Sequence, residues 1–451
     1  MFGLNNNQKE AIGLLQIGTF LEYFDLMLYV HMAMILNELF FPQTDTHTAS
    51  LLSATAFCST FIFRPFGALI FGWIGDNIGR KATVVITTFM MSISCIIMAN
   101  LPTYAQIGIS AAWIVTICRI IQGMSSMGEM VGAEIYLTET IKGPIRYPVV
   151  ASLEPISALG GTAALGVAFL VTTLEYNWRI AFWIGGGIAV IGTIARTRLR
   201  ETPDFVDMKR RMYRAIQESA NENNNISPAQ LLKNHNPAIL EKVQTKTSLS
   251  LLFMQCTLPV FFYFSYVYCG HILQDSFSYT AEQVINHNLL FSLVDFLALS
   301  FWAMLSYKIY PLKLLKTKLV IFSIFFVFCV YSLNHISHPF QLFLIQSFVM
   351  WFALDSMPAV PIFYRHFPIF KRFTYTSFIY ALSRALMFPI TSFGLIYLTK
   401  YFGNWGILII IIPITIGYAF GLLHFEKLER EEGYYPNGNN TPITTPPIPG
   451  N

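Results

Sequence analysis

Charged side chains are scarce in this sequence. Asp, Glu, Lys and Arg together make up 12% of the 451 residues, whereas hydrophobic residues make up 54%. A soluble globular chain carries about 25% charged residues, which cover its surface with groups that water solvates. A chain this apolar must place most of its outward-facing side chains in hydrocarbon. The composition therefore excludes a water-soluble protein and predicts an all-α membrane protein.

Motifs for enzymatic chemistry, metal binding and ATP binding are absent from the sequence. The six cysteines include no C-x-x-C pair, and the nine histidines are scattered along the chain. None of the patterns H-E-x-x-H, G-x-S-x-G and G-x-x-x-x-G-K-[ST] occurs. We therefore expect no enzyme, no ATP-driven pump, no metal or other cofactor, and no nucleic-acid partner.

Long apolar runs dominate the chain instead. A membrane-spanning helix needs about 20 mostly apolar residues, and twelve such stretches can be marked. The first six lie at 12–36, 50–74, 82–100, 108–136, 149–173 and 179–196. The second six lie at 248–270, 285–306, 319–335, 340–363, 374–398 and 405–424. The spacing predicts twelve transmembrane helices in two six-helix bundles, an arrangement typical of transporters built from two repeats.

The loops between these spans indicate how the chain is organised and oriented. We expect one bundle over 1–196, a polar central loop over 197–247, a second bundle over 248–424 and a disordered tail over 425–451, which is rich in Pro and Asn. Lys and Arg gather in the even-numbered connections, whereas the odd-numbered connections hold Lys400 alone. Because basic loops stay in the cytoplasm, both termini and the central loop should face that side.

Polar residues inside the first-half spans are candidate functional residues, because a charge in hydrocarbon is costly. Glu22 and Asp25 are three residues apart on the first span and share one face. Arg119, Gln122 and Glu129 fall in one stripe of the fourth span. Two polar stripes in the same half suggest a shared cavity. A static ion pair that only holds the helices together remains the alternative.

The second-half spans carry their own embedded charges. Asp295, Asp355 and Arg384 lie within predicted helices and could line the other side of the same cavity. Buried ions need partners whether or not they act, so pairing for structure alone is an equal reading for these residues. Arg64, in the second span, fits the structural reading better.

The connection between the second and third spans carries the pattern G-x-x-x-D-x-x-G-R-K, at Gly72, Asp76, Gly79, Arg80 and Lys81. Its glycines permit a tight turn and close helix approach. This loop, together with R-x-x-Q-G at 119–123, resembles the two signatures of the major facilitator superfamily.

Finer motifs resemble the metabolite:proton symporter family, in particular its proline/betaine type. They are LEYFD at 21–25, FRPFG at 63–67, QGMSSMGE at 122–129, WRIAF at 178–182 and LRETPDF at 199–205. The second half departs from the family, because the loop at 306–311 reads SYKIYP and lacks both the Asp and the Gly of the repeated signature. That departure puts the solute in doubt more than the class of protein.

The resemblance implies a major facilitator fold and secondary active transport, by proton-coupled symport of a small polar metabolite such as proline or betaine. It implies a multi-pass monomer in the cell inner membrane whose partners are the solute, protons and lipid. It makes the loop at 72–81 a one-sided cytoplasmic latch with a partner near the eleventh helix. Asp25 becomes the first choice of proton carrier, ahead of Glu129, with Arg119 as its switchable partner.

Two other functions stay open from the sequence. One is symport of an organic acid, either a dicarboxylate or a shikimate-like acid, by the same fold. Arg64, Arg119 and Arg384 would favour it by binding carboxylates. The other is a receptor or scaffold that kept the fold and lost transport, because fold alone does not fix function.

The charge pattern predicts that the central loop faces the cytoplasm. Single cysteines placed in the 197–247 loop and at Ser278 of a cysteine-free variant should react differently with an impermeant thiol reagent added outside the cell. We expect labelling at position 278 and none in the central loop. The reverse pattern would contradict the orientation.

Overall fold

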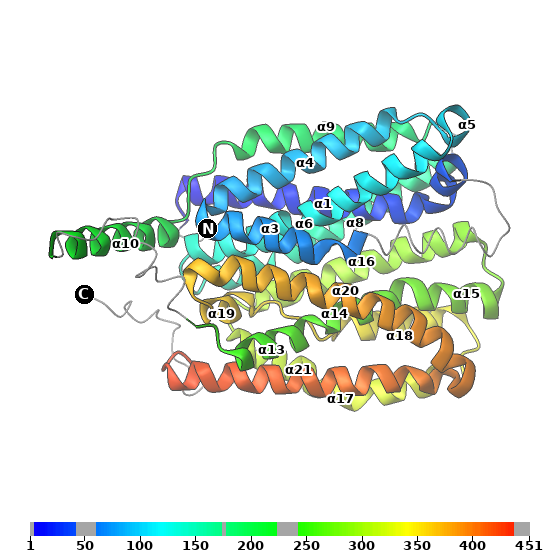
Figure 1. Ribbon diagram of the computed structural model, residues 1–451. Helices are drawn as coiled ribbons and strands as arrows, with labels where there is room; N and C mark the ends of the chain where they lie inside the picture. The colour runs from blue at the N-terminus through cyan, green and yellow to red at the C-terminus, as the bar shows by residue number, and fades with distance from the viewer. Residues whose placement is uncertain (1–3, 42–59, 174–176, 223–241, 437–451) are drawn as a thin grey trace.

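The computed structural model describes residues 4–41, 60–173, 177–222 and 242–436, and in these the regular structure is helical. The chain forms two helical bundles that lie side by side with their long helices roughly parallel (Figure 1). The first bundle contains α1 (Asn6–Phe40), α3 (Arg64–Asn77), α4 (Arg80–Asn100), α5 (Tyr104–Ile107), α6 (Ile109–Thr140), α7 (Arg146–Ala151), α8 (Leu153–Thr173) and α9 (Arg179–Arg196).

The second bundle begins after α10 (Pro203–Glu222) and contains the remaining helices. They are α13 (Thr245–Gln255), α14 (Thr257–Phe262), the π-helix η1 (Tyr263–Tyr268), α15 (Cys269–Phe277), α16 (Ala281–Leu305), α17 (Pro311–Leu333), α18 (Pro339–Trp351), α19 (Val360–Arg365), α20 (Ile369–Phe402), the 3-10 turn η2 (Gly403–Trp405) and α21 (Gly406–Glu431). We call the end of the molecule where α1 begins, α21 ends and α10 projects the α10 end (Figure 1).

The described chain has the apolar exterior that a bilayer requires. Eight helical stretches are long and apolar enough to cross a membrane, and the last of them, Ile369–Glu431, contains both α20 and α21. Large apolar side chains point outward from several helices; Ile191, Phe328 and Ile416 are 65–68% exposed. In water such exposure would be unfavourable, whereas in lipid it is not. The prediction of a multi-pass all-α membrane protein is confirmed.

Two predicted spans are interrupted, and each irregular stretch contains or is closely followed by a proline. The span at 340–363 stops at the end of α18 and resumes only at α19, after Pro358. The span at 248–270 breaks after Gln255, because Pro259 lacks the N–H that would bond to the Gln255 carbonyl four residues earlier. Arg384 of α20 donates to that freed carbonyl, at 3.2 Å. A helix break thus supplies part of the central site.

Several helices extend beyond their predicted ends. The prediction followed runs of apolar residues, so it left out the helical turns that carry charged residues. α6 continues to Thr140, α17 begins at Pro311 and α21 runs to Glu431. The predicted tail therefore starts too early, and only residues 437–451 of it lie outside the described part. The predicted central loop holds a helix, α10. Of the span at 50–74, residues 50–59 are not described.

Glycines allow α3 to approach helices of both bundles. A Cβ on Gly67 would lie 2.6 Å from the Met124 Cα of α6, and one on Gly72 would lie 2.6 Å from the Thr374 Cα of α20. Neither helix backbone can yield that space without moving. Small residues at helix crossings are how membrane helices pack closely.

Gly67→Ala should therefore destabilise the first bundle, by about 1–3 kcal/mol for overpacking. Thermal unfolding of the detergent-solubilised protein would report this as a lower midpoint. Gly187→Ala is the matched control, because Gly187 is an exposed helical glycine with open space around its Cα. Equal midpoints for the two variants would contradict the close packing of α3 on α6.

Candidate functional site

The two bundles are joined at the α10 end by a carboxylate from α3. Asp76 accepts hydrogen bonds from the backbone N–H groups of Phe373 (3.0 Å) and Thr374 (2.8 Å) in α20. It also pairs with Arg80 at 2.9 Å. The partner of Asp76 thus lies on the eleventh predicted span, the place where we expected it. Its role in gating stays a prediction.

Glu139, near the end of α6, connects both bundles and lay outside the predicted span. Its carboxylate binds Arg80 of α4 at 3.1 Å and Arg372 of α20 at 2.9 Å. The Thr202 hydroxyl donates to it at 2.7 Å. Arg80 also donates to the Ile369 carbonyl of α20 at 2.8 Å. In the sequence, Glu139 follows the apolar run of the fourth span by a few residues. A count of apolar residues ends before it, so the sequence analysis did not select it.

The remaining residues of the loop pattern hold its turn in place. Gly79 adopts φ +153°, which favours glycine, and a Cβ there would overlap the Glu201 carboxylate. Glu201 accepts from the backbone N–H of Arg80 (3.0 Å) and of Lys81 (3.3 Å). The residues at 199–205 therefore dock on the loop rather than hang free. Gly72 completes the set through its close approach to Thr374.

A further polar contact between the bundles lies beside this network. Tyr364 of α19 donates to Glu134 of α6 at 2.5 Å, and both side chains are buried. Phe205 of α10 meets Phe370 of α20 edge to face, with ring centroids 6.1 Å apart. We call these contacts and those of Asp76 and Glu139 together the closing network. Most of its bonds are polar, so water can replace them when the bundles part.

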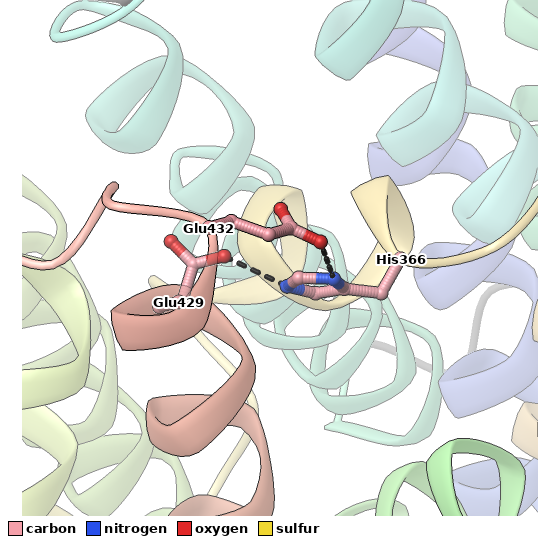
Figure 2. Close-up of side chains that lie close together, drawn as sticks. All are labelled: His366, Glu429 and Glu432. Carbon is pink, nitrogen blue, oxygen red and sulfur yellow. Dashed lines mark hydrogen bonds and ion pairs between the residues drawn. The ribbon is translucent and has the colours of Figure 1, made fainter.

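A second charged cluster ties helices of the second bundle together at the same end (Figure 2). His366 contacts Glu429 through Nε2 (2.7 Å) and Glu432 through Nδ1 (3.3 Å). Glu429 also pairs with Arg365 and accepts from Tyr310. The second bundle, whose loop at 306–311 lacks the Asp and Gly of the signature, therefore has this charged cluster at the same end. Because the two ring nitrogens face different carboxylates and Glu429 already has two further partners, we interpret the cluster as a clamp rather than a metal site.

Asp25 and Arg119 meet between α1 and α6. Their nearest charged atoms are 4.0 Å apart. Asp25 also accepts from the Cys95 thiol at 3.1 Å. Arg119 donates to Gln122 at 2.9 Å and lies 4.0 Å from the centroid of the Tyr29 ring. The two predicted stripes thus come together, and a loose ion pair with few other partners can exchange one contact for another.

Glu22 and Glu129 are the other two carboxylates of these stripes. Glu22 is buried in α1, with 1% of its surface exposed, and interacts electrostatically with Tyr23. Glu129 lies in α6, but its side chain is outside the described part of the structure. Asp25 therefore remains the carboxylate with a visible contact to Arg119.

A cavity of about 230 Å³ lies between the two bundles. Helices α1, α3 and α8 line it from one side, and α14, η1, α16, α18 and α20 from the other. Asp25 and Arg119 are not among its lining residues, so this pair lies outside the cavity wall. The polar sides of α1 and α6 face each other, and Tyr23 and Met27 of α1 form the wall instead.

Two arginines on the cavity wall have no carboxylate partner among the described residues. Arg64 lies 4.7 Å from the Phe61 ring centroid. Arg384 donates to the Gln255 side chain at 2.9 Å and lies 3.5 Å from the Tyr380 ring centroid. Both are at least 96% buried. A buried guanidinium that forms no ion pair with a described carboxylate is poised to bind an anion, so the structural reading of Arg64 is not supported.

Asp295 and Asp355 separate in the structure. Asp295 of α16 lines the cavity, whereas Asp355 lies behind it in an ion pair with Lys318 at 2.8 Å. The sequence prediction placed Lys318 in a connection, but it is 1% exposed in α17. Glu154 of α8 also lines the cavity. The cavity therefore presents two cationic and two anionic side chains.

The cavity lies far from either end of the bundles. Arg384 follows Phe373 by eleven residues, so it lies roughly 16 Å further along α20 than the closing network. A central cavity between two six-helix halves, closed at one end by polar contacts, is the architecture of the major facilitator superfamily. Residues 14–368 match the model of the sugar (and other) transporter family, and the chain belongs to that family.

Curated relatives match only part of the chain. It is 32% identical to a proline/betaine transporter of Salmonella typhimurium over 234 residues, which are 50% of this chain and 47% of the relative. It is 35% identical to an inner membrane metabolite transport protein of Escherichia coli over 211 residues, 45% of this chain and 48% of the relative. The matches thus span about half the length of these relatives.

Solved structures share the fold over nearly the whole chain. A proton:xylose symporter of the major facilitator superfamily superposes with a TM-score of 0.71 at 13% identity, covering 93% of this chain and 95% of that one. The human organic anion transporter MFSD10 superposes with a TM-score of 0.64 at 15% identity, covering 94% and 100%. At such identities the likeness establishes the fold alone.

Glu139→Gln should weaken closure at the α10 end, because it leaves Arg80 and Arg372 without their shared carboxylate. Losing one partner of a buried ion pair costs about 3–5 kcal/mol. Spin labels at the exposed Lys142 and Lys308, one on each bundle, should move apart in a double electron–electron resonance measurement. Asp207→Asn, which removes an exposed ion pair with Arg210, is the control. Unchanged distances in Glu139→Gln would show that Glu139 does not hold this end closed.

Proposed function

We propose that this chain is a secondary active transporter that carries a small polar solute bearing a carboxylate, together with a proton. The observation that carries the proposal is the central cavity, whose wall holds Arg64 and Arg384 with no ion pair to either guanidinium among the described residues. Its volume, about 230 Å³, is below the roughly 300–1,000 Å³ of pockets for drug-sized ligands. A small metabolite fits that space.

The closing network supports transport by alternating access. It seals the α10 end, which the charge pattern assigns to the cytoplasm, so this conformation would face outward or be occluded. Opening inward requires Asp76, Glu139 and Glu134 to release α19 and α20. Because many of these contacts are polar, hydration can offset their loss, and the two states can lie close in free energy.

Asp25 is our proposed proton carrier. Its ion pair with Arg119 sits behind the cavity wall, close enough for Arg64 to act on Arg119 electrostatically. An anion bound by Arg64 would weaken that repulsion and so change the strength of the pair. Protonation of Asp25 would release Arg119 toward Gln122 and Tyr29. Coupling would then run from solute through Arg64 to the pair, without direct contact between solute and proton carrier.

The charges of the cavity limit the class of solute, and the relatives suggest particular candidates within that class. Proline, betaine and organic acids all carry the carboxylate that two buried arginines favour. The Salmonella typhimurium relative is a proline/betaine transporter. A receptor or scaffold would gain nothing from uncompensated buried charges, which argues against loss of transport. We place the protein in the cell inner membrane as a monomer with both termini in the cytoplasm.

Asp25→Asn tests the coupling role, because it removes the titrating group while keeping a similar shape. In proteoliposomes with an imposed pH gradient, the variant should lose accumulation of labelled solute at least tenfold and retain exchange of solute down its gradient. Asp275→Asn, at an exposed position of α15, should retain both. Accumulation by Asp25→Asn would remove Asp25 as carrier, whereas misfolding with loss of both activities would favour a static ion pair.

A further inference from the structure

One wall of the cavity carries hydrogen-bond acceptors that nothing in the described chain satisfies. Asn288, Ser292 and Asp295 lie four and three residues apart on α16, so they share one face, and all three line the cavity. Asn288 and Asp295 are 7% and 5% exposed. Their Oδ1 atoms are buried without a hydrogen-bond partner. Leaving such an atom unpaired is unfavourable, so these oxygens are arranged for a donor from elsewhere.

The rest of each side chain is held by η1, which fixes where the free oxygen points. Asn288 Nδ2 donates to the Tyr266 backbone carbonyl at 3.4 Å, and since a carbonyl can only accept, the amide oxygen is the atom left free. The Tyr266 hydroxyl donates to Asp295 Oδ2 at 3.3 Å, which leaves Oδ1. The π-helix shifts the backbone pattern at this point, as such turns often do at functional sites.

Two carboxylates of this wall form no ion pair among the described residues. Glu154 of α8 interacts electrostatically with Asp295, Asp355 and Lys318. Helix α8 lies beside α16, where Thr162 donates to Ser292 at 3.0 Å. Lys318 is already bound to Asp355, so Asp295 and Glu154 have no ion-pair partner among the described residues. Buried charges of this kind require a cation or a proton.

Two of the aromatic rings that line the cavity already lie against the protein's own arginines. Arg64 lies over the ring of Phe61 and Arg384 over that of Tyr380, so the protein's own cations use these faces. Phe388 packs on Phe61 with centroids 4.3 Å apart. The α16 part of the wall offers a cationic ligand unpaired oxygen acceptors, which need N–H donors.

We propose that Asn288 and Asp295 bind an N–H-bearing ammonium group of the solute, while Arg64 and Arg384 bind its carboxylate. The inference rests on the proposed function for the carboxylate end and adds the second end. A primary or secondary ammonium donates to both free oxygens, whereas a fully N-methylated ammonium has no N–H and leaves both unpaired. The cavity therefore selects an amino acid over its N-methylated betaine, two kinds of solute that the names of its relatives combine.

Matched ligand pairs test this directly on the full chain in nanodiscs. Glycine against glycine betaine, and L-proline against its N,N-dimethyl derivative, share a carboxylate and differ at the nitrogen. Isothermal titration calorimetry should give at least tenfold tighter binding for the N–H member of a pair. Equal or tighter binding of the methylated member would overturn the inference, and wild-type protein alone suffices for that result.

Variants of α16 test whether the preference for the N–H-bearing ligand comes from Asn288 and Asp295. Asn288→Leu and Asp295→Asn should each reduce the preference for the N–H member at least threefold, by weakening that member alone, and Asp275→Asn should leave it unchanged. A variant that weakens both members equally would overturn the assignment to α16. Succinate distinguishes a failure of this inference from a failure of the proposed function. If succinate binds and neither glycine nor L-proline does, the ammonium site is overturned and carboxylate transport is not. Failure of all these ligands to bind or be taken up would remove both.

Discussion

The buried carboxylate of Glu139 is one of the contacts that join the two halves of this protein. It is shared by Arg80 of the first bundle and Arg372 of the second. Taking three charges out of water is costly, and the cost is offset only while all of them stay together. Once the bundles separate, each charge must be rehydrated. We therefore expect the closed end to open as a unit, as the proposed alternation between two states requires.

Breaks in the helices supply the polar groups of the cavity. In a membrane every backbone group must be bonded, so an interrupted helix is tolerated only where something else completes its bonds. Pro259 frees a carbonyl that orients Arg384, and η1 offers one that orients Asn288. Both irregular segments lie on the cavity wall. The second bundle thus keeps a polar site although its signature loop is missing.

The cavity wall also has charges of both signs, and they come from different helices. Its cations come from α3 and α20 and its anions from α8 and α16, so each bundle contributes one charge of each sign. A solute that reaches both would hold the bundles together around itself. A movement of either bundle changes both ends of that contact, which gives a physical basis for coupling solute binding to closure.

The sequence by itself determined the membrane class, the approximate helices and the family, because apolar run length and loop motifs are local properties. It also determined that Asp25 and Arg119 share the first bundle, and its resemblance to the superfamily implied a partner for Asp76 in the other bundle. It did not reveal Glu139 or Lys318, which lie in charged turns that an apolar count discards. Only the tertiary structure decided that Arg64 and Asp295 line the cavity while Asp25 and Asp355 do not. That outcome depends on how each helix is rotated against its neighbours, and rotation is set by packing between residues hundreds of positions apart, such as Gly72 on Thr374.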